Sequence, residues 1–242
     1  MNGRHLKEVG SRRRGEKTNE ACLVYTFQSE FIYRAVFAEP LFELLDSHSR
    51  IFRLVYSVCT PFGASAQDIT YEGNLREPAS ATITGKCRTA SVSLKVQLTN
   101  LQVHWTYSPG EDIAPAQTVA EKTIELLGEA GFSVLPLGTH LITWAGHLKL
   151  SDITPSEYLS RFVSGVPIEL GATEPVGVGF SKEATDERLA CAINFQPSIA
   201  VEDGIYSRFD LQWSGQLGIS DVVEKTRTEV WKTLKSCGLI EK

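Results

Sequence analysis

Hydrophobic and polar side chains alternate most regularly over residues 92–107. Apolar residues occupy every second position of two consecutive segments: Val92, Leu94, Val96 and Leu98, then Leu101, Val103, Trp105 and Tyr107. This period of two is typical of strands that bury one face. A two-residue turn at Thr99 and Asn100 would pair Leu98 with Leu101 and keep all the apolar side chains together. The pattern therefore predicts a β-hairpin, with His104 on its polar face.

Apolar residues spaced three and four positions apart follow the hairpin, and this spacing predicts a helix over residues 114–130. Gly131 ends this helix, because glycine accepts the left-handed conformation that satisfies the last carbonyl groups. Residues 134–150 then return as extended chain, with breaks expected near Gly138 and Gly146. One face of this extended segment is expected to carry Ile142, Trp144 and Leu148.

A capping box starts the next helix. Thr154 is followed three residues later by Glu157, with Pro155 in the first turn. Such a pair satisfies backbone N–H groups at a helix N-terminus. The sequence therefore predicts a short helix over residues 156–163.

The C-terminal third repeats the order strand, strand, helix. Two alternating segments on either side of Asp203-Gly204 predict a second hairpin, with Leu189, Cys191, Ile193 and Phe195 on one strand and Ile205, Phe209, Leu211 and Trp213 on the other. Ser220 and Asp221 are expected to cap a final helix, which ends at Gly238. Since each second strand carries a tryptophan, the two halves suggest a pseudo-duplicated ββα unit.

The N-terminal region is less regular. Residues 23–27, 31–37 and 51–58 are predicted as strands, residues 40–47 as one or two helical turns, and residues 65–85 as a long loop with one short strand near Thr82. Together these elements predict an α+β fold, built mainly from antiparallel sheet with helices packed on it. We expect residues 19–242 to form a single body, or two fused lobes over residues 19–150 and 151–242.

Charge is distributed unevenly along the 242 residues. The chain has 24 Lys and Arg against 29 Asp and Glu, a formal charge of −5, but residues 1–18 hold six basic and two acidic residues. Residues 19–242 are therefore left with 18 basic and 27 acidic residues. A flexible basic arm over residues 1–18 is expected ahead of an acidic body. Arg12, Arg13 and Arg14 are the candidates for contact with nucleic acid, and a solvated tail is the alternative.

Composition predicts a soluble cytoplasmic protein. The chain is 42% hydrophobic and 22% charged, which is typical of a globular protein with a buried core. Its five cysteines are odd in number and widely spaced, as expected for reduced thiols. No export signal is recognised, and residues 130–148 are too polar for a membrane span.

The motifs of several common chemistries are missing. The sequence contains no GxSxG, GxxxxGK[ST] or GxGxxG string, and Gly177-Val178-Gly179-Phe180 is the nearest fragment. We therefore expect no cofactor and no metal. The candidates for acid–base chemistry are His140, His147 and Asp210, with a structural histidine and a solvated aspartate as alternatives.

Nucleic-acid binding is expected only through the arm. Tyr206 and Arg208 share one face of a predicted strand, but that face has no second basic residue and the surrounding body is acidic.

A strand over residues 101–107, a returning strand over 141–147 and an acidic-aromatic helix over 155–159 carry a topological resemblance. Together with the closing strand pair and terminal helix, their order is similar to that of a sporadically distributed family of uncharacterised bacterial proteins. The resemblance covers residues 92–242 and implies a fold but no activity, since the family has none established. Thr143, Trp144 and Ala145 depart from the arginine- and asparagine-containing strand of that family.

These patterns favour a non-enzymatic binding or protein-interaction module. Its partner is expected to be an unknown protein or a second copy that pairs through an exposed strand edge, and no membrane is expected. Two alternatives stay open: a cofactor-independent enzyme with a His/Asp acid–base site, and weak nucleic-acid contact through the arm.

Overall fold

One large sheet organises the chain. The computed structural model describes residues 22–74, 77–107, 113–132, 134, 137–163 and 177–241. The strands are β1 (Cys22–Phe37), β2 (Ile69–Asn74), β3 (Glu77–Cys87), β4 (Val92–Gln97), β5 (Asn100–Tyr107), β6 (Leu137–Leu150), β7 (Val178–Lys182), β8 (Arg188–Pro197), β9 (Gly204–Ser214) and β10 (Leu239–Glu241). The α-helices are α1 (Glu43–Asp46), α2 (His48–Cys59), α3 (Ala114–Glu129), α4 (Pro155–Val163) and α5 (Ile219–Ser236). Two short 3₁₀ helices, Thr60–Phe62 and Ala66–Asp68, connect α2 to β2.

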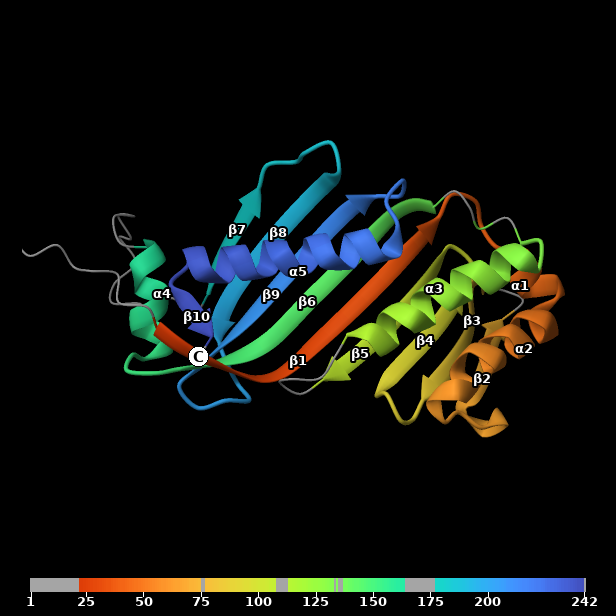
Figure 1. Cartoon of the computed structure of the whole chain (residues 1–242), viewed down its shortest axis with the longest axis horizontal. Coiled ribbons are helices and arrows are strands. Elements are labelled where there is room, and N and C mark those ends of the chain that lie inside the picture. Colours follow the sequence, from red (N-terminus) through yellow and green to blue (C-terminus); the bar gives the residue numbers. More distant parts are fainter. Residues whose placement is uncertain are drawn as a thin grey trace, which may run out of the picture.

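The two longest strands lie side by side in the middle of the sheet. The strand order is β2-β3-β4-β5-β1-β6-β9-β8-β7, with antiparallel neighbours throughout, and β10 adds a parallel pairing at the start of β1 (Figure 1). β1 and β6 pair from Val24 opposite Leu150 to Phe37 opposite Leu137. The predicted α+β class with a mainly antiparallel sheet is confirmed.

The chain follows the same path through the sheet twice. β1 is followed by inserted helices, a meander that ends in β5 beside β1, and the long helix α3. β6 is followed by the inserted helix α4, a meander that ends in β9 beside β6, and the long helix α5. The repeated unit is therefore larger than the ββα motif in the sequence, because it includes a central strand and an insertion.

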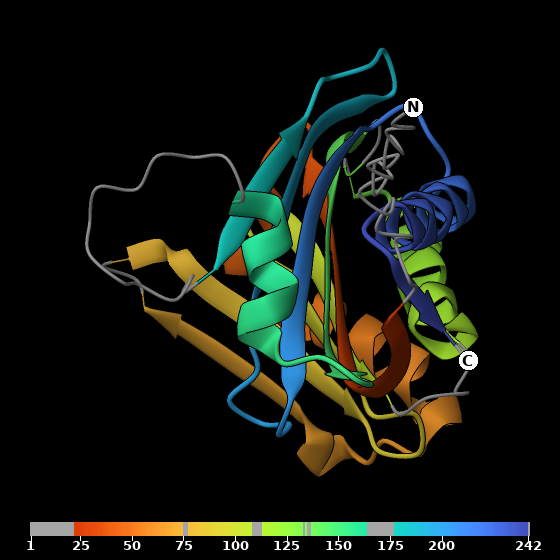
Figure 2. The same cartoon turned by 90° about the vertical axis from the view of Figure 1, so that its left-hand side faces the viewer.

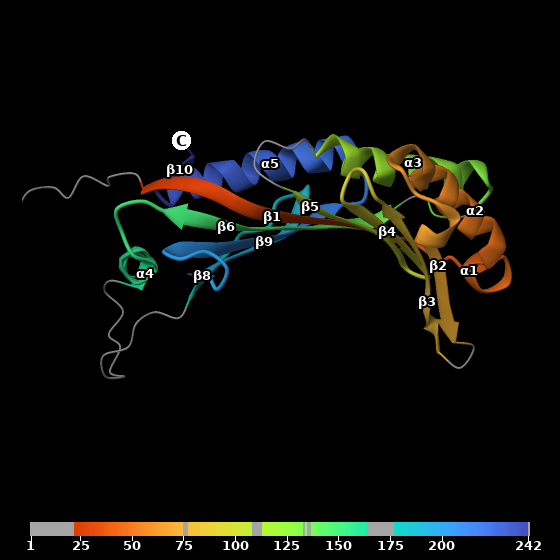
Figure 3. The ribbon, with the colours of Figure 1, turned by 90° about the horizontal axis from the view of Figure 1, so that it is seen from below.

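Helices cover one face of the sheet. Figures 2 and 3 show α3 and α5 on the same side, and Figure 3 shows β2 and β3 turning toward the opposite side, which makes that side concave. Alternate residues of the central strands are buried toward the helices, as in β5, where Leu101, Val103 and Trp105 are at most 2% exposed. The intervening residues of these strands point to the other face of the sheet. In the described part of the chain, no helix covers this face, which we call the open face.

Polar contacts fasten α5 to the outer strands. Trp213 Nε1 donates to Thr226 Oγ1 at 2.9 Å, and Glu229 accepts ion pairs from Lys182 at 2.7 Å and Arg188 at 3.0 Å. Burial alone would raise the pKa of Glu229, but the bond from Lys182 and the charge of Arg188 hold it below its ordinary value. The helix is thereby attached to β7, β8 and β9 together.

Several predicted elements agree closely with the structure. The predicted helix over residues 114–130 is α3, and Gly131 follows it with a φ of 79°. The capping box at α4 is present, since the backbone N–H of Glu157 donates to Thr154 Oγ1 and the backbone N–H of Thr154 donates to the Glu157 carboxylate. The hairpin of β4 and β5 is confirmed, but its register differs by two residues: Val96 faces Leu101, so Leu98 lies in the turn.

The N-terminal predictions were largely wrong. Residues 51–58 belong to helix α2, and residues 65–85 contain most of a β-hairpin, β2 and β3, in place of a long loop. The two strands predicted over residues 23–37 are one strand, β1, with a bulge between Thr26 and Ser29.

Smaller corrections apply to the later elements. β6 runs through Gly138 and Gly146 without a break. A register shift between Arg188 and Ala190 exposes Leu189, which was predicted to be buried. Gly218 is the N-cap of α5, and neither Ser220 nor Asp221 caps it.

The packing of two backbones predicts opposite effects for two glycines. At Gly215, just after β9, an added Cβ would collide with the carbonyl oxygens of Leu137 and Gly138 at the start of β6, whereas Gly128 in α3 has open space. Gly215→Ala should lower the free energy of unfolding by about 1–3 kcal/mol, as overpacking does. Gly128→Ala should raise it by up to about 1 kcal/mol, because alanine favours a helix. Urea unfolding of both variants checks this prediction, and equal effects would contradict it.

Candidate functional site

The open face presents alternating side chains from the central strands. Its rows consist of Glu30, Ile32 and Arg34 from β1, Gln102, His104 and Thr106 from β5, Leu141, Thr143 and His147 from β6, and Tyr206, Arg208, Asp210 and Gln212 from β9. They share this face because their neighbours in sequence are buried toward the helices. Most of them are half-buried.

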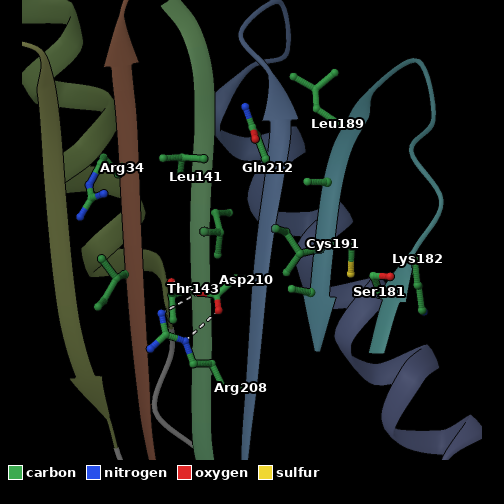
Figure 4. Close-up of a pocket in the computed structure, with 15 residues that line it drawn as sticks. Arg34, Leu141, Thr143, Ser181, Lys182, Leu189, Cys191, Arg208, Asp210 and Gln212 are labelled. Carbon is green, nitrogen blue, oxygen red and sulfur yellow. Dashed lines mark hydrogen bonds and ion pairs between the residues drawn. The ribbon is translucent and has the colours of Figure 1, made fainter. Parts of the chain in front are cut away.

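A cavity of about 610 Å³ lies on this face. Residues of β1, β6, β9, β8 and β7 line it, among them Arg34, Thr143, Arg208 and Asp210 (Figure 4). A cavity of about 540 Å³ shares Arg208 and Asp210 with it, and a third cavity, of about 240 Å³, shares Tyr206 with the second. The three together form one groove across the middle of the sheet, and we call it the central groove.

Arg208 and Asp210 form the polar centre of the groove. Arg208 donates to both carboxylate oxygens of Asp210, at 2.8 Å from Nε and 3.0 Å from Nη2, and Thr143 Oγ1 donates to Oδ1 at 2.6 Å. The bond to Asp210 raises the pKa of Arg208. The carboxylate therefore has three hydrogen bonds within the groove and is held in one position.

Arg34 brings a second guanidinium to the same face. Its Nη2 donates to Gln102 Oε1 at 3.0 Å, but its Nε is buried and has no hydrogen-bond partner among the described residues. β1 and β9 are separated by β6 alone, so Arg34 and Arg208 belong to strands roughly 10 Å apart. Arg34 lies in register with Leu141 and Gln212, whereas Arg208 lies opposite Ala145, so the two arginines are also four residues, roughly 13 Å, apart along the strands. An extended ligand with several anionic groups could therefore contact both guanidinium groups.

Two histidines lie on the open face at the groove and beside it. His104 Nε2 is 2.7 Å from Glu30 Oε1. His147 Nδ1 is 2.8 Å from Ser198 Oγ, and its ring lies 5.1 Å from that of Tyr206. Burial raises the pKa of Tyr206, so this phenol stays protonated at neutral pH.

His140 lies on the opposite face and is fully buried. Its Nδ1 is 2.8 Å from the Tyr33 hydroxyl, and its Nε2 is 3.0 Å from the Leu217 carbonyl oxygen. A carbonyl can only accept, so Nε2 carries the proton and Nδ1 accepts from Tyr33. Burial lowers the pKa of His140, which keeps the ring neutral. His140 is thus a structural histidine that joins β1, β6 and the loop before α5.

The structure does not bring the three acid–base candidates together. His140 faces the helices, while His147 and Asp210 face the open side. On the paired strands β6 and β9, His147 lies beside Tyr206 and Asp210 beside Thr143. This separation of four residues along the strands amounts to roughly 13 Å.

The other candidates are placed as follows. Arg12, Arg13 and Arg14 lie outside the described residues. Gly177 and Gly179 line one of the cavities, and an added Cβ at Gly179 would lie 3.0 Å from Asn194. In the described ranges, no three His, Cys, Asp or Glu side chains are grouped as a metal site would require. No helix in these ranges is long and apolar enough to cross a membrane.

No protein-family model matches the sequence, and no curated protein is similar to it. The resemblance to a family of uncharacterised bacterial proteins stays a prediction.

The buried His140 predicts an acid-sensitive step in stability. Since the folded pKa is lowered below the ordinary 6.5, the unfolded chain binds more protons as pH falls through that value, and stability is lost there. Wild type should lose stability between about pH 7 and 5.5, where His140→Gln should lose less because glutamine cannot titrate. Urea unfolding at several pH values measures both slopes.

Tyr33→Phe provides the matched variant, because it removes the hydroxyl and keeps the titrating ring. It should cost about 1–3 kcal/mol, the penalty for an unsatisfied buried acceptor. Equal slopes for wild type and His140→Gln would show that His140 is not the group responsible.

Proposed function

We propose that this protein is a non-enzymatic binding module that takes an anionic ligand on the open face of its sheet. The observation that carries the proposal is the central groove, in which Arg34 and Arg208 reach the same face from β1 and β9. Guanidinium groups recognise carboxylates, phosphates and sulfates through paired N–H donors.

The bonding within the groove supports binding rather than acid–base chemistry. Asp210 already accepts bonds from Arg208 and Thr143, so both of its carboxylate oxygens are engaged within the groove. The alternative of a His/Asp acid–base site has no support in the geometry, since His140, His147 and Asp210 do not converge.

We place this module in the cytoplasm. Cys59, Cys87, Cys191 and Cys237 carry free thiols, which is usual for proteins of a reducing compartment. A protein partner, or self-association through a strand edge, stays a prediction that a single chain does not test.

Retention on heparin, a sulfated polyanion, tests the groove. Wild type should be retained at low salt, and Arg34→Ala and Arg208→Ala should each elute at lower salt because each loses one cationic contact. Arg227→Ala is the matched control, since this exposed arginine lies on α5, away from the groove. If all four proteins elute together, the groove is not an anion site.

The basic arm can be tested separately on the same column. The triple variant Arg12→Ala, Arg13→Ala, Arg14→Ala should elute at lower salt if the arm contacts polyanions, and it should respond additively with Arg208→Ala. An unchanged elution would favour the solvated tail. A salt gradient that compares the single, triple and combined variants checks this.

A further inference from the structure

The open face is more basic than the body that carries it. Within the described strands it presents five basic residues: Arg34, Lys86, Lys95, Lys149 and Arg208. It presents three acidic residues: Glu30, Glu72 and Asp210. Residues 19–242 as a whole have 18 basic against 27 acidic residues. Asp210 is bound by Arg208, and Glu30 faces His104, so the carboxylates available to repel an anion are few.

Hydrogen-bonding amides are the second feature of this face. Six carboxamide side chains lie on its rows: Gln97, Asn100, Gln102, Asn194, Gln196 and Gln212. Threonine and serine hydroxyls lie between them. Each carboxamide can both donate and accept, so the surface suits a ligand rich in hydroxyl and base-edge groups.

We propose that the ligand is double-stranded RNA, bound with its minor groove against the concave open face. This inference rests on the proposed function and adds the class of ligand. Arg34 and Arg208 contact phosphates, while the carboxamides and hydroxyls contact ribose 2′-hydroxyls and base edges. The minor groove of an A-form helix is wide and shallow, so it presents these groups to a broad surface.

Two other nucleic acids fit this face less well. Single strands are bound mainly by stacking on aromatic side chains, and Tyr206 is the only Phe, Tyr or Trp on the described open-face rows from Glu30 onward. The minor groove of B-form DNA is only about 6 Å wide, so a broad sheet can enter it only if the duplex is deformed.

The sequence limited nucleic-acid contact to the arm because the body is acidic and because Tyr206 and Arg208 lack a basic neighbour on their face. Tyr206 and Arg208 have no second basic residue on their own strand. The fold supplies that residue from β1, since Arg34 shares the face with Arg208 across β6.

Fluorescence anisotropy with labelled nucleic acids tests this proposal on the full chain. The probes are a 20-base-pair RNA duplex, the DNA duplex of the same sequence and the corresponding single-stranded RNA. The RNA duplex should bind at least about tenfold more tightly than either of the others, because only it combines A-form shape with 2′-hydroxyls. Affinity should fall as salt rises, since phosphate contacts release counterions.

Variants locate the contact. Arg34→Ala and Arg208→Ala should each weaken RNA-duplex binding about tenfold and lower its salt dependence, as expected for lost phosphate contacts. Arg34→Lys should recover part of the affinity, because lysine keeps the charge but lacks the fork. Arg227→Ala on α5 should bind like wild type.

Several results would overturn the inference. They are equal binding of RNA and DNA duplexes, preference for the single strand, tighter binding of a poly-glutamate peptide than of the RNA duplex, and insensitivity to both arginine variants. Heparin retention distinguishes a failure of the RNA assignment from a failure of the anion site. If Arg34→Ala and Arg208→Ala shift elution from heparin but no RNA duplex binds, the anion site stands and only the RNA assignment fails.

Discussion

The antiparallel pairing of β1 with β6 is the interaction on which the rest of the structure depends. These strands are the longest in the sheet, and each begins one copy of the repeated path. Every other strand except β10 attaches outward from one of them through β5 or β9. Tyr33 and His140, one from each strand, add a buried hydrogen bond at the same seam. Separation of the two strands would leave two half-sheets, each with an unpaired edge.

Covering one face of this sheet determines the chemistry of the other. Because α2, α3 and α5 take up the apolar side chains of alternate residues, the intervening residues are left in contact with water and are mostly polar. Sheet register then brings side chains of distant sequence into one surface. The central groove is a product of this register, since its arginines are contributed by strands from opposite ends of the chain.

Local pattern predicted the elements that depend on local interactions. The alternation in β4 and β5, the helical spacing in α3 and the capping box of α4 all involve residues close in sequence. The prediction for residues 51–58 was wrong because β-branched Ile51, Val55 and Val58 outweighed a spacing of four and three residues, which is helical. For His140 the structure agrees with the alternative of a structural histidine, since the ring is fully buried. That Arg34 and Arg208 line the same groove could not be predicted, because it requires β6 to lie between strands about 170 residues apart in sequence.

β1 has a further consequence for how the chain becomes folded. It is the first described element to emerge during synthesis, yet its partners are β5, β6 and β10, which follow it by roughly 70 to 220 residues. For much of translation, a sixteen-residue strand therefore has unpaired backbone groups along both edges. The strand that holds the finished molecule together is thus also the segment most exposed to misassociation on the ribosome, where holding chaperones would have most to protect.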